Sequence, residues 1–365
     1  MVTPKPAARR RAPEWGQQVS GAALWLLDVR IGLVGLLVVL GAGASAAAPA
    51  DPALETVLSR LDQDEHSDLK GVVVMRGGLR VAERYYNGAT EDTLHDIRSA
   101  GKSVTSLLVG IAIDQGMIRS VEDPVVRYWP EARGSAIGDV RLRDVLGMRS
   151  GLDAYDEDPA SPGNEDKMDE AADPLAFVLS VPRADPPGTR YRYNSVTAYA
   201  AGLVVAKATG VKLADFAQAA LFAPLGITRW QWAQDLSGHT KGQGNLSLTT
   251  RELATLGEMV RNGGSHQGSR IVSGTWLREA LTPQVDIAHS DPYADGYGYF
   301  WYAKTQLIDG QPVTVSFASG NGGNKIYIVP SRQLVVAITS GAYGRAYGQR
   351  RSESILQAVL AAGGR

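Results

Sequence analysis

The chain contains no cysteine, which excludes disulfide bonds, cysteine nucleophiles and cysteine-ligated zinc. Its five histidines show neither the H-x-x-x-H nor the H-E-x-x-H spacing of zinc enzymes, so we expect no metal and no other cofactor. A net charge of -1 and the lack of any run of Lys or Arg in the body of the chain argue against a nucleic-acid partner. The 365 residues, 44% of them hydrophobic, are sufficient for one large domain or two closely packed ones.

The first 50 residues have the features of a targeting segment. Arginines precede the apolar segment 31–50, whose strongly apolar part is shorter than the roughly 20 residues that span a bilayer. Ala44-Ser45-Ala46 fits the small-x-small pattern of a signal-peptide cleavage site. We therefore expect residues 1–50 to direct export to the periplasm or the medium. A retained membrane anchor over residues 31–50, or a cytoplasmic tail without a targeting role, is the alternative.

Strand patterns occur near both ends of the remaining chain. An expected helix, "PALETVLSRLDQ", precedes a hairpin of "GVVVMRGG" and "LRVAERYYNG", with Gly77-Gly78 as its turn. "GYGYFWYA", "VTVSFAS", "KIYIVP" and "QLVVAITS" predict further strands, followed by a last helix near 350–361. These segments predict a sheet built from both ends of the chain.

The middle of the chain has a different pattern. It is rich in Pro, Asp and Gly and predicts helices at 140–147, 173–181, 194–209 and 212–222 without a strand pair. The fold class is therefore α+β, an antiparallel sheet flanked by helices with an inserted all-α domain. We expect residues 51–135 and 246–365 to form a discontinuous α/β domain, and residues 136–245 to form the helical domain.

The stretch "HDIRSAGKSVTSLLVGIAIDQG", residues 95–116, allows two interpretations. A phosphate-binding P-loop, G-x-x-x-x-G-K-[ST], would need a glycine at Asp96, where a carboxylate would repel phosphate. The segment before it is also too polar for the buried parallel strand that precedes a P-loop. The alternative is S-x-x-K, in which Ser99 is a nucleophile and Lys102 follows one helical turn later. We favour the second interpretation.

The spacing of Ser99 and Lys102 fits nucleophilic catalysis. Residues three apart share a helix face, so the Lys102 amine can reach the Ser99 hydroxyl. The apolar residues between Val104 and Ile113 surround the helix, which predicts that it is buried on all sides. Burial of an unpaired lysine lowers its pKa, and we expect such a shift for Lys102. Taken alone, the motif also fits a serine helix cap followed by a surface lysine.

Two further stretches follow in order, "PPGTRYRYNSVTAYAAGLVVAKATG" and "FASGNGGNKIYIVP". Together with "RSAGKSVTSLLVGIAIDQGMI" and "LRDVLGMRSGLDAYDED", they resemble the serine β-lactamase and penicillin-binding-protein superfamily. The likeness is to its class C-like branch, which includes esterases and 6-aminohexanoate-dimer hydrolases. It extends from about Leu54 to the last helix and implies a β-lactamase/transpeptidase-like fold.

The resemblance also implies roles for individual residues. Ser99 corresponds to the nucleophile, Lys102 to the group that accepts its proton, and Tyr193 to the tyrosine that assists proton transfer. The backbone N–H groups of Ser99 and Asn321 are expected to form the oxyanion hole. The remaining candidates are substrate-binding residues: Tyr155, Asn194, Ser195, Gly320 and Gly322.

Two motifs depart from the family pattern. In Tyr193-Asn194-Ser195, the usual asparagine position holds Ser195, and Asn194 beside it is a candidate partial substitute. Around Ser319 the Lys or His of K-T-G or H-T-G is absent, which removes the cation that holds a substrate carboxylate in lactamases and transpeptidases. We therefore rank β-lactam hydrolysis below amide or ester hydrolysis.

The sequence as a whole predicts a serine hydrolase that cleaves an amide or ester bond in a small-molecule or peptide-like substrate through a Ser99 acyl-enzyme. One alternative is a true class C-type β-lactamase or D-alanyl-D-alanine carboxypeptidase. The other is a non-hydrolysing acyl sensor or peptidoglycan-binding module, in which the acyl-enzyme forms and persists.

Overall fold

The computed structural model describes residues 51–308 and 310–363, so the predicted leader lies outside the described residues. The helices are α1 (Pro52–Arg60), α2 (Gly101–Asp114), α3 (Leu142–Leu146), α4 (Glu165–Glu170), α5 (Pro174–Ser180), α6 (Ser195–Thr209), α7 (Leu213–Ala217), α8 (Thr250–Arg261), α9 (Gly274–Leu281) and α10 (Ala346–Ala362). The strands are β1 (Leu69–Arg76), β2 (Leu79–Tyr85), β3 (His95–Asp96), β4 (Trp230–Trp232), β5 (Leu246–Leu248), β6 (Ser265–His266), β7 (Ser269–Arg270), β8 (Val285–Asp286), β9 (Gly296–Tyr297), β10 (Tyr302–Ile308), β11 (Gln311–Gly320), β12 (Asn324–Val329) and β13 (Leu334–Ser340).

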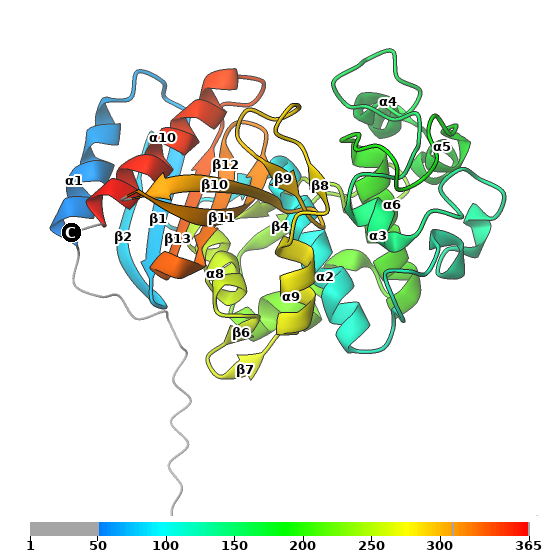
Figure 1. Cartoon of the computed structure of the whole chain (residues 1–365), viewed down its shortest axis with the longest axis horizontal. Helices are drawn as coiled ribbons and strands as arrows, with labels where there is room; N and C mark the ends of the chain where they lie inside the picture. Colours follow the sequence, from blue (N-terminus) through cyan, green and yellow to red (C-terminus); the bar gives the residue numbers. More distant parts are fainter. Residues whose placement is uncertain (1–50, 309, 364–365) are drawn as a thin grey trace, which may run out of the picture. The chain divides into compact units, whose positions relative to one another are not determined.

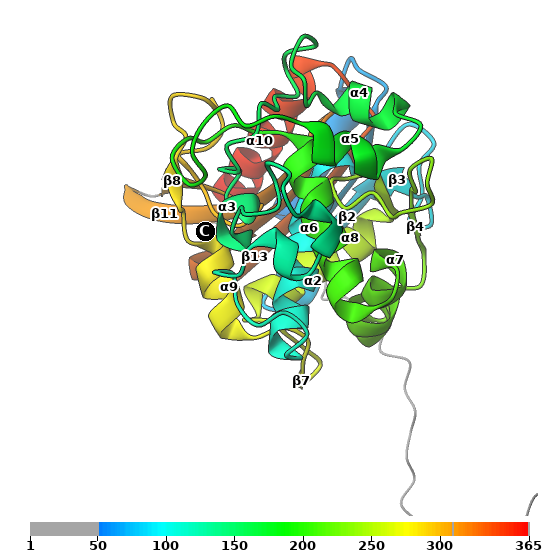
Figure 2. The same ribbon diagram turned by 90° about the vertical axis from the view of Figure 1, so that its right-hand side faces the viewer.

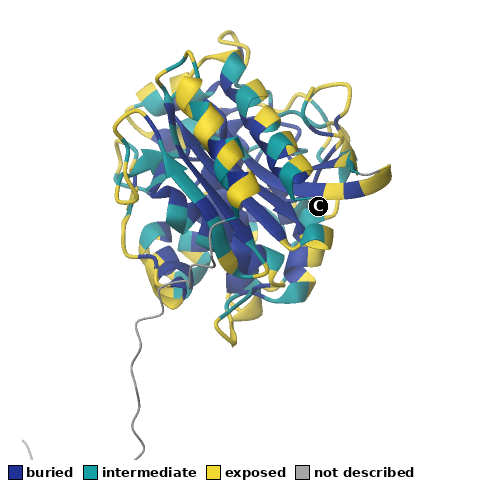
Figure 3. Cartoon of the chain, turned by 90° about the vertical axis from the view of Figure 1, so that its left-hand side faces the viewer, coloured by how far each residue is buried: buried dark blue, intermediate teal, exposed yellow. Residues whose placement is uncertain are grey.

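An eight-stranded antiparallel sheet has the order β2-β1-β13-β12-β11-β10-β9-β8. Helices α1 and α10 cover one face and α8 packs on the other, so β12 and β13 are buried along their whole length (Figures 1 and 3). The turn between β1 and β2 contains Gly77 and Gly78, whose positive φ angles of 58° and 87° suit a tight hairpin. The predicted antiparallel sheet flanked by helices is confirmed.

The helical part of the chain lies at the opposite end from α1 and α10 (Figures 1 and 2). Helices α3, α5 and α6 match the predicted segments, and the segment at 212–222 forms α7 followed by a π-helical turn, Gln218–Phe222. The sequence pattern missed helix α4 and strand β4, which pairs with β5 in a three-stranded sheet with β3.

Helix α2 runs between the sheet and the helical part and contacts α6, α9 and β11. As predicted, every residue from Gly101 to Ala112 is buried. Trp276 of α9 packs so closely on Gly110 that a Cβ atom there would lie 2.2 Å from the Trp276 ring. This packing fixes the helix that carries the S-x-x-K motif.

Helix α6, the main partner of α2, is apolar and buried from Ser195 to Val205. Within residues 51–308 and 310–363, no single helix has the length and composition to cross a bilayer. One bent pair, Ser195–Thr209 with Leu213–Leu225, passes such a test by length and composition, with a bend of 74°.

Candidate active site

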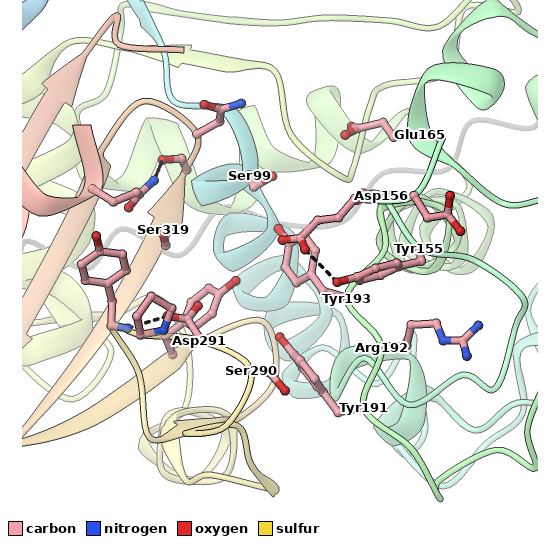
Figure 4. A pocket seen from close by; sticks show the side chains of 18 of the residues that line it. Ser99, Tyr155, Asp156, Glu165, Tyr191, Arg192, Tyr193, Ser290, Asp291 and Ser319 are labelled. Carbon is pink, nitrogen blue, oxygen red and sulfur yellow. Dashed lines mark hydrogen bonds between the residues drawn. The ribbon is translucent and has the colours of Figure 1, made fainter. Parts of the chain in front are cut away.

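A pocket of about 800 Å³ lies where the end of β11 meets the loops of the helical part. Figure 4 shows Ser99 near its centre, with Ser319 and Asp291 on one side and Tyr193, Asp156 and Glu165 on the other. The lining residues are Ser99, Asp153, Tyr155, Asp156, Glu157, Asp158, Ser161, Glu165, Arg190, Tyr191, Arg192, Tyr193, Ser290, Asp291, Pro292, Tyr293, Tyr302, Ser319, Gly320, Asn321, Lys325 and Gln349.

Ser99 sits in a 3₁₀ turn, Arg98–Ala100, directly before α2. The preceding residue, Arg98, has a positive φ of 52°, a strained conformation for a residue with a side chain. Its N–H donates to Asp96 Oδ1 at 2.8 Å, and its guanidinium lies 4.3 Å from the centroid of the Tyr343 ring. Tyr343 in turn donates to the Asp96 carbonyl at 2.7 Å. These contacts hold the turn that presents the Ser99 hydroxyl to the pocket.

Lys102 is 1% exposed and has an acceptor for each of its three ammonium protons. Its Nζ donates to Ser99 Oγ at 3.0 Å, to Ser195 Oγ at 3.0 Å and to the carbonyl of Gln243 at 2.8 Å. The predicted contact between Ser99 and Lys102 is therefore present. The other two acceptors come from distant parts of the chain, α6 and the loop before β5.

The predicted lowering of the Lys102 pKa is wrong. Burial does oppose the charged form, but Tyr193 and the carboxylates of Glu165 and Asp156 outweigh it and raise the pKa of Lys102. Burial in turn raises the pKa of Asp156 and that of Glu165, while the Lys102 charge acts in the opposite direction. Asp156 is tied to the same cluster because its Oδ1 accepts the Ser195 N–H at 3.0 Å. Lys102 therefore rests in the site as an ammonium.

Tyr193 lies beside this cluster, with its ring centroid 5.0 Å from Lys102 Nζ. Its ring packs edge-on against Tyr297, with 6.5 Å between centroids and an interplanar angle of 85°. Ser99 and Tyr193 both line the pocket, and Lys102 is in contact with each of them. The structure thus brings together the three residues predicted to be catalytic.

Gly320 lets the end of β11 approach the turn that carries Ser99. A Cβ atom at this position would lie 2.0 Å from the Ile97 carbonyl oxygen and 3.1 Å from the Ala100 nitrogen, which excludes any larger residue. Asn321 follows in the pocket wall, with its Oδ1 accepting the Gly344 N–H at 2.8 Å. Gly322 packs under the Tyr343 ring and is not a lining residue.

The other predicted substrate-binding residues have different surroundings. Tyr155 is 36% exposed at the pocket and donates to Glu157 at 2.7 Å. The Asn194 side chain is used inside the protein, because it caps α6 through the Thr197 N–H at 2.8 Å and donates to the Arg192 carbonyl at 2.9 Å. This counts against Asn194 as a substitute for the missing asparagine. Ser195, by contrast, contacts Lys102 directly.

Sequence reasoning missed several groups around the site. Asp156 and Glu165 belong to a stretch of acidic composition that is typical of solvated surface. Only the structure shows that both are half-buried and interact with Lys102 and Ser195. Gln243 contributes through its carbonyl, for which the sequence holds no signal. Lys325 lies in the strand "KIYIVP", where a single charged residue at the start of an apolar run was the available signal.

Comparisons with known proteins give a consistent result. The sequence model of a family described as Beta-lactamase matches residues 61–360. A curated relative, 6-aminohexanoate-dimer hydrolase from Paenarthrobacter ureafaciens, is 30% identical over 254 residues, which is 64% of this chain and 64% of that protein. The chain thus aligns with slightly less than two thirds of this relative's length.

Solved structures of low sequence identity share the fold. A class C beta lactamase from Rhodobacter sphaeroides matches with a TM-score of 0.63 and 18% identity, covering 84% of this chain and 99% of that one. A family VIII carboxylesterase matches with a TM-score of 0.65 and 17% identity, covering 86% of this chain and 99% of that one.

Proposed function

The chain belongs to the beta-lactamase family, and from this premise we propose that it is a serine hydrolase that cleaves an amide or ester bond through an acyl-enzyme on Ser99. The observation that carries the proposal is the contact of Lys102 Nζ with Ser99 Oγ at 3.0 Å, at the wall of an open pocket. A serine hydroxyl becomes a useful nucleophile when a neighbouring group takes its proton.

In the proposed first step, Ser99 Oγ attacks the substrate carbonyl and its proton passes to Tyr193 Oη, because Lys102 as an ammonium has no lone pair to accept it. The reactive form of the pair is therefore the one in which the tyrosine oxygen faces the Lys102 ammonium without its own proton. The pair then gives this proton to the leaving amine or alcohol as the bond to the carbonyl carbon breaks. Water next attacks the acyl-enzyme and loses a proton to the same pair, which returns it to Ser99 Oγ. Because its pKa is raised, Lys102 acts in this proposal as a cation. It stabilises the negative charge on the oxygens of Ser99 and Tyr193 while the proton moves between them, and Tyr193 lines the pocket.

The negative oxygen of the tetrahedral intermediate needs donors close to Ser99. We assign these to the backbone N–H groups of Ser99 and Asn321. The tight packing of Gly320 against Ile97 and Ala100 supports this assignment, because it brings the start of the Asn321 turn next to the turn of Ser99. The Asn321 turn is itself held by the contact of its side chain with Gly344.

Amide or ester substrates rank ahead of β-lactams in this proposal. The third motif lacks the Lys or His of K-T-G or H-T-G, and Ser319-Gly320-Asn321-Gly322-Gly323 stands there. The likeness to a curated 6-aminohexanoate-dimer hydrolase and to a carboxylesterase structure points in the same direction.

The test compares Ser99→Ala with Ser106→Ala. Ser106 lies on the same helix, is fully buried and has no side-chain hydrogen-bond partner among the described residues, so its loss leaves the site unchanged. We expect Ser99→Ala to abolish both p-nitrophenyl butyrate turnover, by about 10³-fold or more, and labelling by a fluorophosphonate in intact-mass spectrometry. Ser106→Ala should keep both. Labelling of Ser99→Ala at the wild-type rate contradicts the assignment, and stable labelling without turnover in the wild type points to the acyl sensor.

A further inference from the structure

A second buried lysine lies at the same pocket, on the sheet side. Lys325 is 1% exposed and stands on β12 directly opposite Ser319 of β11. Its Nζ donates to Ser319 Oγ at 2.7 Å. Around it are the rings of Phe317, with its centroid 4.7 Å from Nζ, and Tyr327, at 5.8 Å. Both Lys325 and Ser319 line the pocket that contains Ser99.

The carboxylates of Asp291 and Glu353 act on Lys325 without forming an ion pair with it. Within residues 51–308 and 310–363, it forms no ion pair, and Ser319 is the one hydrogen-bond partner found for its three ammonium protons. The neighbouring Lys304 is different, because it pairs with Glu353. A buried cation without a directly bonded anion is costly, and an anionic ligand bound beside it would offset part of this cost.

Ser319 extends this cation toward the substrate. Because its Oγ accepts a hydrogen bond from Lys325, the hydroxyl proton is free to be donated to another acceptor. A hydroxyl held by an ammonium is polarised and binds anionic oxygens more strongly than a free hydroxyl does. The next residue, Gly320, packs on the Ile97 carbonyl and the Ala100 nitrogen on either side of Ser99. Any acceptor bound by Ser319 therefore lies close to the carbonyl that Ser99 attacks.

We propose that Lys325 and Ser319 form an anion-binding subsite, and that the preferred substrate is an amide or ester with a free carboxylate close to the scissile bond. This inference rests on the proposed function, since it adds the substrate class to the Ser99 hydrolase. The cation comes from the neighbouring strand β12, whereas the segment around Ser319 lacks the Lys or His of the family motif.

Protonation should be linked to this binding. Burial lowers the pKa of Lys325 to about 7, Asp291 and Glu353 oppose the shift, and Lys304 adds to it. A carboxylate beside Lys325 favours its ammonium form, so binding above pH 7 is accompanied by proton uptake. The KM for an anionic substrate should therefore rise between pH 7 and pH 9, whereas the KM for a neutral substrate should not show this rise.

The experiment compares two acyl chains of similar length, mono-p-nitrophenyl glutarate with a terminal carboxylate and neutral p-nitrophenyl butyrate. In Lys325→Met at pH 6.5, kcat/KM for the glutarate should fall about tenfold or more, mainly through KM, and the rise of KM above pH 7 should disappear. Butyrate turnover should stay within threefold. Ser319→Ala should show the same selectivity with a smaller loss, which keeps the test open if Lys325→Met does not fold.

Several results would overturn the subsite. Equal losses for both esters would show that Lys325 only supports the structure, and an unchanged glutarate KM would show that it does not meet the substrate. Ser99→Ala separates the two proposals, because it should abolish hydrolysis of both esters if Ser99 is the nucleophile. If the wild type hydrolyses neither ester, the proposed function fails, and calorimetry with glutarate decides the subsite. Binding that is at least tenfold weaker in Lys325→Met supports it, and equal or absent binding contradicts it.

Discussion

Lys102 and Lys325 are both 1% exposed, and each donates to a serine that lines the same pocket, yet their pKa values shift in opposite directions. Lys102 has three hydrogen-bond acceptors and two carboxylates near it, and its pKa is raised. Lys325 has one hydroxyl acceptor and aromatic rings, and burial lowers its pKa to about 7.

The difference shows that burial by itself does not determine the charge of a lysine. Removal from water favours the neutral amine in both cases, and the result depends on the oxygens that replace the water. At Lys102 the protein supplies these oxygens, which favours the ammonium, and in the proposed mechanism this cation assists the chemistry at Ser99. At Lys325 the supply is incomplete, which leaves room for the oxygens of a ligand.

The largest effect on activity is expected from the replacement of Lys102, the lysine with three hydrogen-bond acceptors. Lys102→Met leaves Ser99 without its neighbouring cation, and we expect kcat/KM for p-nitrophenyl butyrate to fall about 10³-fold. Thermal unfolding of the variant establishes that it is folded, and the rate of fluorophosphonate labelling reports on Ser99 itself. A folded variant with kcat/KM within tenfold of wild type would show that Lys102 has no part in activating Ser99.

The next effect concerns the stability of Lys325→Met. Loss of a buried side chain's contacts normally destabilises a protein, whereas this variant should be stabilised. Below pH 7, Lys325 is charged in both the folded and unfolded states, and the folded state bears the full cost of its burial. Between about pH 7 and the ordinary lysine pKa of 10.5, the unfolded state binds more protons, so this cost disappears as the pH rises. Lys325→Met should therefore be more stable than wild type at pH 6, by a few kcal/mol at most, and this gain should shrink toward pH 10.

Urea unfolding of both proteins at several pH values between 6 and 10 measures this difference, and groups common to the two proteins cancel. A difference in unfolding free energy that is independent of pH would mean that Lys325 titrates alike in the two states. The contrast between the two lysines would then be lost.

The parts of this picture that the sequence predicted are local ones. The helix beginning near Ser99, its burial and the contact of Ser99 with Lys102 follow from residues within a few turns of one another. The acceptors Ser195 and Gln243 come from distant parts of the chain. So do Tyr193 and the carboxylates of Glu165 and Asp156, whose approach to Lys102 reversed the predicted direction of its pKa. The hydrophobic periodicity of a sequence predicts helices and strands, but it does not show which distant residues come into contact with one another.

The position of Lys325 on the sheet side of the pocket also depends on contacts between distant parts of the chain. The strand signal of "KIYIVP" predicted β12, but the position of Lys325 opposite Ser319 depends on the register between β11 and β12. A shift of one residue would place the lysine on the other face of the sheet. The sequence therefore showed that a lysine was missing from the third motif, but not that another lysine reaches the same pocket.

The smallest effect is expected at Ser195, which joins Lys102 to the carboxylates. Ser195→Ala removes one of the three acceptors of Lys102, while Ser99 Oγ, the Gln243 carbonyl and the backbone contact to Asp156 remain. A single hydrogen bond to a charged group contributes about 1.5 to 3 kcal/mol, part of which the remaining acceptors recover, so we expect kcat/KM to fall roughly tenfold. The fall should be the same for the neutral and the anionic ester, in contrast to the selective loss in Lys325→Met. A selective loss in Ser195→Ala would mean that the two lysines act on one subsite and that the separation between them is wrong.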